Sequence, residues 1–206
     1  ANHYAVSQEI FLSLLKKGYI YTATMSQPFC SNCRRFLPDR YLEGTCPFCH
    51  APGARGDQCD ACGKPINAVE LIEPRCRICG TPPQFKDSEH FFLKLTAFQD
   101  RLLDWVGKQT HWRPNALNFT LRYLEEGLKD RAITRDIEWG IPLPLAGYEG
   151  KRLYVWFEAV IGYLSASKEW AKSTADETRW RPFWQGDGVK SYYFIGKDNI
   201  VFHTMN

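Results

Sequence analysis

Hydrophobic side chains at the start of the chain follow first the spacing of a helix and then that of a strand. The helical spacing continues through the first zone, residues 1–24, as far as Gly18, where a glycine predicts the end of the helix. The β-rich segment 19–24 then predicts a strand. The apolar residues that carry the helical spacing are Ile10, Phe11, Leu14 and Leu15.

The second zone, residues 25–83, has few large apolar residues and many Pro and Gly, which predicts a loop-rich region. A strand is expected after it, at 90–95. Thr96 and Gln99 have the spacing of a capping box, which predicts the start of a helix that ends at Gly107. Another helix is expected after Pro114. The apolar faces of the two helices are Phe98, Leu102, Trp105 and Val106, and Leu117, Leu121, Leu124 and Leu128.

The third zone, from Ile133 onward, twice repeats a strand that is followed directly by a helix. The expected elements are a strand at 151–157 and a helix at 158–170, then a strand at 191–195, a turn at 196–198 and a helix at 199–203. Units of this kind build parallel sheets, whose ligands bind at the carboxyl ends of the strands. The residues expected there are Trp156, Glu158, Gly196, Asp198 and His203. A Gly-x-Asp turn is equally often an ordinary turn without a ligand.

The composition of the 206 residues is that of a folded protein without a strong charge. Apolar residues make up 44% and aromatic residues 15%, which supplies a packed core and argues against disorder. The net charge of +3 does not by itself require a nucleic-acid partner. The sequence shows neither a secretory signal nor an apolar run near the ~20 residues of a membrane helix. We therefore expect a cytoplasmic protein with no membrane partner.

All eight cysteines lie between residues 30 and 79, in four Cys-x-x-Cys pairs. One spacing used four times is typical of a metal site, because a tight two-residue turn directs two thiolates to one edge of a tetrahedron. We expect zinc, with disulfides, a redox motif or an iron–sulfur cluster as the alternatives. The pairs are Cys30/Cys33, Cys46/Cys49, Cys59/Cys62 and Cys76/Cys79.

Four pairs can form two four-cysteine sites in three ways. The short loop between Cys49 and Cys59 closes at low entropic cost, which favours one site from the two inner pairs and a second from the two outer pairs. An interleaved pairing stays open. Four thiolates leave no free coordination position, as in structural zinc. His50, next to Cys49, is expected to be exposed rather than a ligand.

Short motifs follow one another in a characteristic order along the chain. They are 36–40 (FLPDR), 44–47 (GTCP), 56–59 (GDQC), 70–74 (ELIEP), 87–92 (DSEHFF), 133–136 (ITRD), 139–142 (WGIP), 154–163 (YVWFEAVIGY) and 194–198 (FIGKD). This succession resembles the methionyl-tRNA synthetases, a family of class I aminoacyl-tRNA synthetases, over essentially the whole chain.

The resemblance implies an α/β fold in which parts of a Rossmann-like parallel sheet are interrupted by a zinc-knuckle α+β insertion, the connective-peptide domain. Residues 1–24 would end the first half of the catalytic domain, 25–132 would form the insertion with two zinc ions, and 133–206 would begin the second half. The family's His-Ile-Gly-His and Lys-Met-Ser-Lys-Ser motifs do not occur in the sequence. We therefore expect a fragment that is inactive by itself.

For the intact enzyme, the resemblance implies activation of methionine with ATP and Mg²⁺ to methionyl-adenylate, and transfer of the methionyl group to tRNA. By motif match, Trp156, Ala159, Tyr163 and His203 would line the methionine pocket, Phe202 would support it, Gly196 and Asp198 would contact the adenosine, and Arg135 would lie near the activated carboxylate. Without the resemblance, Trp156 and Tyr163 would be interpreted as core residues.

The chain departs from the family at Glu158 and Val160, where the family usually has the Asp and Pro of Asp-Ala-Pro. The longer acidic arm and the lost proline restraint alter the expected shape of the pocket wall. Arginines of the knuckle region are candidates for contact with tRNA phosphates, or form an ordinary basic surface. They are Arg34, Arg35, Arg40, Arg55, Arg75 and Arg77.

Two other classes of function stay open. A stand-alone zinc-ribbon adaptor for nucleic acid or protein would confine its functional surface to residues 25–83. A synthetase for branched aliphatic amino acids would need an editing barrel, and the segment 84–132 is too short and too helical for one.

Overall fold

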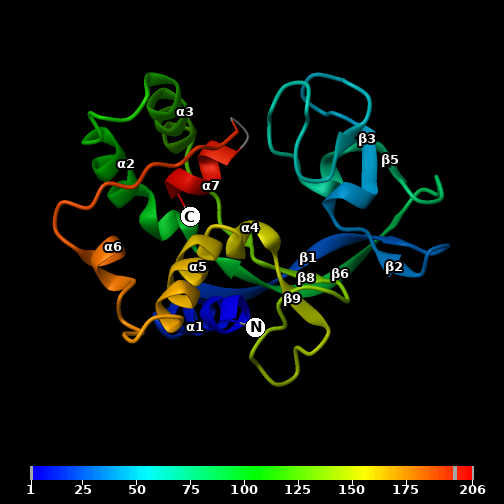
Figure 1. Ribbon diagram of the computed structural model, residues 1–206. Coiled ribbons are helices and arrows are strands. Elements are labelled where there is room, and N and C mark those ends of the chain that lie inside the picture. The colour runs from blue at the N-terminus through cyan, green and yellow to red at the C-terminus, as the bar shows by residue number, and fades with distance from the viewer. Residues whose placement is uncertain (1, 197–198, 206) are drawn as a thin grey trace. The chain divides into compact units, whose positions relative to one another are not determined.

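The computed structural model describes residues 2–196 and 199–205, which form two compact units (Figure 1). Thr22–Phe91 together with Arg135–Glu138 forms the first, here named the knuckle unit. Ala1–Tyr21, Phe92–Thr134 and Trp139–Asn206 form the second, here named the helical unit. Taken as a whole, the chain has a mixed α/β fold with several sheets.

The elements of the described chain are short, apart from one long helix and two long strands. The helices are α1 (Asn2–Lys16), α2 (Gln99–Gly107), α3 (Pro114–Glu125), α4 (Val155–Glu158), α5 (Ile161–Lys172), α6 (Arg181–Gln185) and α7 (Ile200–Met205). The strands are β1 (Ile20–Cys30), β2 (Arg35–Phe36), β3 (Leu42–Thr45), β4 (Ala54–Arg55), β5 (Ile72–Cys76), β6 (Gln84–Leu93), β7 (Arg131–Ala132), β8 (Thr134–Asp136) and β9 (Lys151–Leu153). They pair in the orders β2-β1-β6-β7, β4-β3-β5 and β8-β9.

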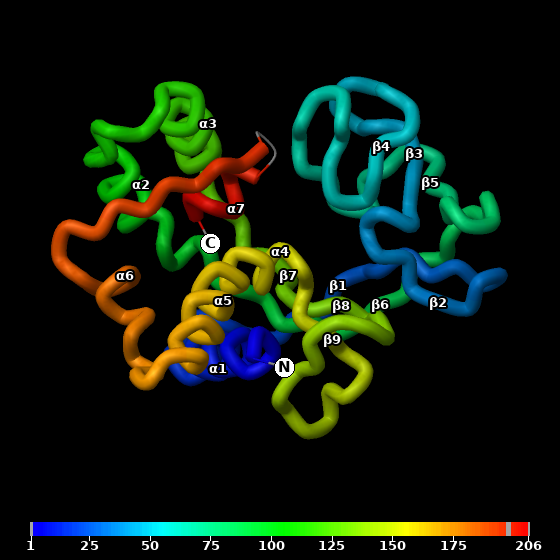
Figure 2. Tube along the Cα trace, viewed as in Figure 1, coloured from blue at the N-terminus to red at the C-terminus, as the bar shows by residue number. Residues whose placement is uncertain are grey.

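Helix α1 ends where its sequence predicts. Gly18 has a φ of 76°, a left-handed conformation that glycine adopts without strain. The N–H groups of Gly18 and Tyr19 donate to the carbonyls of Leu15 and Leu14, both at 3.0 Å, which satisfies the last turn. In the helical unit, α1 packs along α5 with Phe11 fully buried (Figure 2).

The prediction of a capping box at the start of α2 is wrong. The Gln99 side-chain amide reaches the end of α3 instead: its Nε2 donates to the Leu124 carbonyl and its Oε1 accepts from the Leu128 N–H, both at 2.8 Å. The Thr96 hydroxyl donates to the Asp130 carboxylate at 2.8 Å. Both side chains therefore satisfy polar groups far along the chain, which local spacing does not reveal. The predicted end of α2 at Gly107 is confirmed.

The third zone differs most from its prediction. Strand β9 stops at Leu153, and α4 occupies the second half of the expected strand 151–157. The helix expected at 158–170 is α5, which begins at Ile161. The strand predicted at 191–195 is wrong, because that segment has no regular structure and exposes Tyr192 and Phe194 by 78% and 97%. A strand is stable only beside a hydrogen-bonded neighbour, and none of the described strands pairs with this segment.

The knuckle unit contains more strand than its loop-rich composition predicts. Strand β3 lies between β4 and β5, with Glu43 opposite both Arg55 and Arg75 in antiparallel register. Gly44 permits this close pairing, because a Cβ there would lie 2.8 Å from the Ile72 carbonyl oxygen. The β1–β2 and β6–β7 registers are antiparallel as well. The parallel sheet expected for the third zone stays a prediction.

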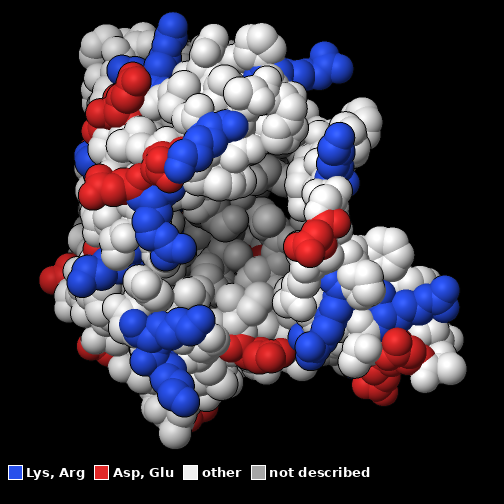
Figure 3. Space-filling view, turned by 90° about the vertical axis from the view of Figure 1, so that its left-hand side faces the viewer, with Lys and Arg blue, Asp and Glu red and all other residues white. Residues whose placement is uncertain are grey.

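On the face of the molecule that Figure 3 shows, charged residues of both signs are exposed. In the knuckle unit, Arg77 pairs with Glu43 at 3.2 Å and Arg55 with Asp60 at 3.5 Å. Two of the six arginines considered for RNA contact are thus already paired with carboxylates.

Candidate metal centres and aromatic pocket

The eight cysteines of the knuckle unit gather into two groups of four. Cys30, Cys33, Cys76 and Cys79 form the outer group, and Cys46, Cys49, Cys59 and Cys62 form the inner group, with the Sγ atoms of each group within 4.8 Å of one another. These are the nested groups that loop closure favours, and the interleaved pairing is not the one adopted.

The sulfur–sulfur distances fit a tetrahedral metal. In the outer group Cys33 Sγ lies 3.5 Å from Cys79 Sγ and 3.9 Å from Cys76 Sγ. In the inner group the Cys49–Cys59 and Cys46–Cys62 distances are 3.7 and 3.9 Å. A tetrahedron with Zn–S bonds of 2.3 Å has edges of about 3.8 Å, whereas a disulfide needs about 2.05 Å. All eight thiols are free, so each group can hold a metal ion such as zinc.

The same backbone turn builds each knuckle. The residue after the second cysteine has a positive φ in all four: Arg34 at 53°, His50 at 57°, Gly63 at 72° and Gly80 at 73°. In three knuckles the N–H of this residue donates to the carbonyl of the first cysteine, as for Gly80 and Cys76 at 2.8 Å. The turn brings backbone amides toward sulfur, and the Cys33 N–H lies 3.4 Å from Cys30 Sγ.

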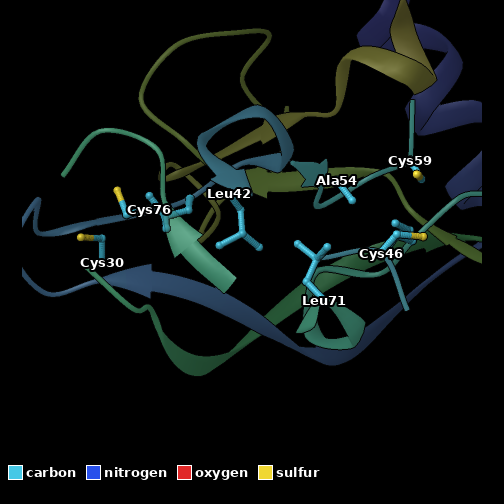
Figure 4. Packing of buried hydrophobic residues seen from close by; sticks show 9 residues of the cluster. Cys30, Leu42, Cys46, Ala54, Cys59, Leu71 and Cys76 are labelled. Atoms are coloured by element: carbon cyan, nitrogen blue, oxygen red, sulfur yellow. The ribbon is translucent and has the colours of Figure 1, made fainter. Parts of the chain in front are cut away.

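The two cysteines of a pair differ in burial. The first cysteine of each pair is at most 1% exposed to solvent. These residues are Cys30, Cys46, Cys59 and Cys76. They pack with Leu37, Leu42, Ala54, Ile66 and Leu71 in the small core of the knuckle unit (Figure 4). The second members lie nearer the surface. A small hydrophobic core thus forms although this part of the sequence has few large apolar residues, and a metal centre at each end would close it.

The thiol pKa values show why each group favours a cation. The Thr81 hydroxyl and the Asn32 side chain lower the pKa of Cys79 to about 5. Hydrogen bonding to Cys79 is the main reason that the pKa of Cys33 rises to about 12. A thiolate thus forms at one cysteine while its neighbour keeps a proton, because adjacent thiolates repel. A divalent ion removes that conflict by replacing the protons.

A second polar cluster ties the 135–138 segment to the rest of the knuckle unit. Asp136 Oδ2 accepts from the Ser88 hydroxyl at 2.6 Å and lies 3.2 Å from Nε2 of the fully buried His90. Arg135 lies in β8 beside Asp136, half-buried. Its predicted position near an activated carboxylate stays a prediction.

The predicted pocket residues of the helical unit come together as an aromatic cluster. The rings of Trp156 on α4 and Phe202 on α7 are stacked, with centroids 4.1 Å apart and planes 9° apart. The Tyr163 hydroxyl lies 2.8 Å from His203 Nε2. Tyr193 packs its ring edge against Tyr163 at 5.3 Å and against His203 at 5.7 Å.

The hydrogen bonds of His203 define its tautomer. Nδ1 lies 2.9 Å from the Asn199 carbonyl, which accepts only, so Nδ1 carries the hydrogen. In the neutral ring Nε2 is then an acceptor, and the Tyr163 hydroxyl donates to it. The cluster therefore presents aromatic faces beside a hydrogen-bonded hydroxyl–imidazole pair, a surface that suits a polarisable side chain.

The other residues predicted for the pocket and for the adenosine contact are exposed or lie outside the described chain. Ala159 follows α4 directly and is exposed. Gly196 is exposed at the end of the extended segment. Asp198 lies outside the described residues, so the adenosine contact proposed for it stays untested.

Sequence reasoning did not find several residues that contact the predicted site. Glu158 accepts from His3 Nε2 at 2.6 Å, and His3 Nδ1 lies 2.8 Å from the buried Ser165 hydroxyl. The Ser165 hydroxyl also donates to the Ile161 carbonyl at 3.0 Å. The longer acidic arm at Glu158 was the only sequence signal for this contact. Tyr193 was missed because its segment was taken for a strand.

The described helices include none that is long and apolar enough to cross a membrane.

The comparisons with known proteins cover the whole chain. The family model for tRNA synthetases class I (M) matches residues 1–206. The chain is 70% identical over 205 residues to a methionine–tRNA ligase of Dehalococcoides mccartyi (strain CBDB1), covering 100% of this chain and 37% of that protein. It is 56% identical to the methionine–tRNA ligase of Thermomicrobium roseum, covering 35% of that protein. The chain thus spans little more than a third of the length of these relatives.

A solved structure shares the fold. The crystal structure of Mycobacterium tuberculosis methionyl-tRNA synthetase bound by methionyl-adenylate matches with a TM-score of 0.62 and 21% identity, covering 100% of this chain and 34% of that chain. The family match extends well beyond residues 25–83, which disfavours a stand-alone zinc-ribbon adaptor. The chain belongs to the class I tRNA synthetases of the methionyl (M) family.

Proposed function

We propose that this chain is the part of a methionine–tRNA ligase that binds the methionine side chain and carries two structural zinc ions. The proposed ligase joins methionine to ATP, with Mg²⁺, and transfers the methionyl group to tRNA. Similarity to methionine–tRNA ligases at up to 70% identity supports this activity.

One observation carries the assignment of the pocket. Residues chosen from motifs up to 47 residues apart in sequence form two contacting pairs, Trp156 with Phe202 and Tyr163 with His203, and the pairs are joined through the consecutive residues 202 and 203 of α7. Aromatic rings attract the polarisable sulfur of a thioether, which favours methionine as the side chain bound here. Ala159, which follows α4 directly, is proposed to complete the pocket wall.

In the proposed first step the methionine carboxylate attacks the α-phosphate of ATP, which forms methionyl-adenylate and expels pyrophosphate. The methionyl group then passes from the adenylate to a hydroxyl of the terminal tRNA adenosine, and AMP leaves. This chain contributes by fixing the amino acid in place, because orientation of the two reactants supplies much of the rate. Arg135 is proposed to stabilise the activated carboxylate, and Gly196, with Asp198 from outside the described residues, to contact the adenosine.

The two cysteine groups are proposed to be zinc centres. Zinc with four thiolates supplies a closed cross-link and no reactive position. The proposed domain division follows the resemblance: 1–24 and 133–206 belong to the two halves of a Rossmann-like catalytic domain, and 25–132 to the inserted connective peptide.

The activity is tested by amino-acid-dependent exchange of pyrophosphate into ATP, using a protein that carries this chain at the full length of its relatives. We expect exchange with methionine and none with leucine or valine. The 206-residue chain alone is expected to show no exchange. Exchange that depends on leucine or valine, or no exchange by the full-length protein, would contradict the proposal.

The acceptor end of tRNA is the proposed macromolecular partner of the knuckle unit. Arg35, which lies over the Tyr41 ring at 5.4 Å, tests this contact. Arg35→Glu should weaken tRNA binding at low salt, where contacts with phosphate are strongest. Pyrophosphate exchange should stay unchanged, because that step does not involve tRNA. Unchanged aminoacylation kinetics across salt concentrations would remove tRNA from the proposal for this surface.

A further inference from the structure

Arg131 lies next to the aromatic stack of the helical unit, although no motif pointed to it. Its guanidinium carbon lies 5.8 Å from the centroid of the Phe202 ring, and Phe202 is in turn stacked on Trp156. The guanidinium also lies 6.0 Å from the Tyr123 ring centroid and donates to the Tyr123 hydroxyl. Arg131 therefore links α3 to the Phe202–Trp156 pair.

The backbone around Arg131 is fixed to the same place. Arg131 pairs with Leu93 in the β6–β7 ladder. Two residues further on, the Ile133 carbonyl accepts from the Tyr154 N–H at 2.9 Å, and Tyr154 is the residue that precedes α4. The strand that carries Arg131 thus also positions the start of the helix that carries Trp156.

The stack needs such a support. Helix α4 has only four residues, and Trp156 and Phe202 are both half-buried, so neither ring is enclosed by the core. A ring at a partly open surface can change rotamer at low cost unless a neighbour restrains it. The positive charge of the Arg131 guanidinium attracts the face of the Phe202 ring, and this cation–π interaction restrains the ring.

We propose that Arg131 is a positioning residue for the amino-acid pocket: it holds Phe202 against Trp156 and so keeps the aromatic wall in the arrangement that accepts methionine. This inference rests on the proposed function. Arg131 acts through Phe202 and does not touch the reacting atoms. The competing interpretation is a purely structural link between α3 and α7, which are also joined by a hydrogen bond between Thr120 and Thr204 at 3.2 Å.

The test is steady-state pyrophosphate exchange by the full-length protein with Arg131→Met. Met keeps an unbranched apolar arm and removes the charge. We expect the KM for methionine to rise about five- to tenfold, while kcat and the KM for ATP stay within about twofold, because only ground-state binding of the amino acid is weakened. Arg131→Lys, which restores the charge, should recover part of the loss.

The matched control is Arg179→Met. Arg179 lies over the Trp170 ring at 5.3 Å in the same unit, the same kind of contact away from the pocket, and its loss should leave all three constants unchanged. If Arg131→Met does not fold, Tyr123→Phe removes only the hydroxyl acceptor of Arg131 and should raise the KM for methionine by about two- to threefold.

An unchanged KM for methionine in Arg131→Met or, where that variant does not fold, in Tyr123→Phe overturns the inference. So does a loss shared equally by kcat and both KM values, which indicates a structural link. Either result leaves the proposed function intact if the wild-type protein shows methionine-dependent exchange. Absence of exchange in the wild type refutes the proposed function instead.

Discussion

The knuckle unit and the helical unit are stabilised in different ways. The knuckle unit has a small core of aliphatic residues and buried cysteines, with a four-cysteine group at each of its two ends. The helical unit relies on contacts spread over many elements, such as the Gln99 bridge to α3 and the Trp156–Phe202 stack. Losing one ion should therefore destabilise the first unit more than losing one contact destabilises the second.

Acidification should produce the largest difference between the units. Burial raises the pKa of Cys46, but the N–H groups of Cys49 and Phe48 outweigh it and lower the pKa to about 7. The pKa of Cys79 in the outer group is lowered to about 5. Below its pKa each thiol must lose a proton before it binds metal, so affinity falls as the pH falls. Each group also holds a thiol whose pKa is raised to about 12, Cys33 in the outer group and Cys49 in the inner group, so both sites should release zinc as the pH falls from about 8 to about 5.

A chromogenic zinc indicator measures this release, and Cys49→Ser identifies which site empties. Zinc release that does not depend on pH would contradict the assignment. The helical unit should keep its far-UV circular dichroism over the same range.

Substitution of single cysteines should have the next largest effect. Cys46→Ser and Cys49→Ser should each remove one zinc and leave the outer site filled. Because Cys46 is also a core residue and Cys49 is exposed, Cys46→Ser should be less stable by a further ~1–2 kcal/mol. Elemental analysis and urea unfolding measure the two effects. Loss of both metals from either variant would show that the sites are coupled.

Removing the hydrogen bond between Tyr163 and His203 in the helical unit should have a smaller effect. Tyr163→Phe removes the donor to His203 Nε2 and should raise the KM for methionine about three- to tenfold in the full-length protein, without a change in zinc content. Tyr192→Phe is the control, since this residue is 78% exposed. Equal effects from both variants would mean that the cluster does not bind the amino acid.

The smallest expected effect comes from the backbone of a knuckle. Gly80→Ala places a Cβ at φ 73° and should destabilise the chain by about 1 kcal/mol. Gly150→Ala is the control, because it meets no atom within 4 Å and its φ is not positive. The thermal unfolding midpoint of Gly80→Ala should lie several degrees below that of Gly150→Ala. Identical midpoints would mean that the knuckle turn tolerates a side chain.

The sequence predicted local features of both units well. The end of α1 at Gly18, the end of α2 at Gly107 and the grouping of the cysteines depend on residues close together in the chain, where spacing and loop closure decide the outcome. The strand at 191–195 failed because strand formation depends on a distant partner that composition does not reveal.

The candidate pocket was predicted from the resemblance and not from spacing. Trp156, Tyr163, Phe202 and His203 have no common periodicity, and without the motifs two of them would have been taken for core residues. The supporting contacts were missed for a related reason. His3 reaches Glu158 across 155 residues, and Arg131 reaches Phe202 across 71. Such pairs are determined by the fold, which pattern analysis of one sequence does not supply.

The central claim is that two closed zinc centres hold the knuckle unit together. The most direct measurement is elemental analysis of the reduced chain combined with hydrogen exchange before and after chelation. We predict close to two zinc ions per chain, and loss of protection on chelation throughout residues 30–79 while α1 and α5 stay protected. A metal-free chain that protects residues 30–79 as strongly as the purified protein would contradict the claim.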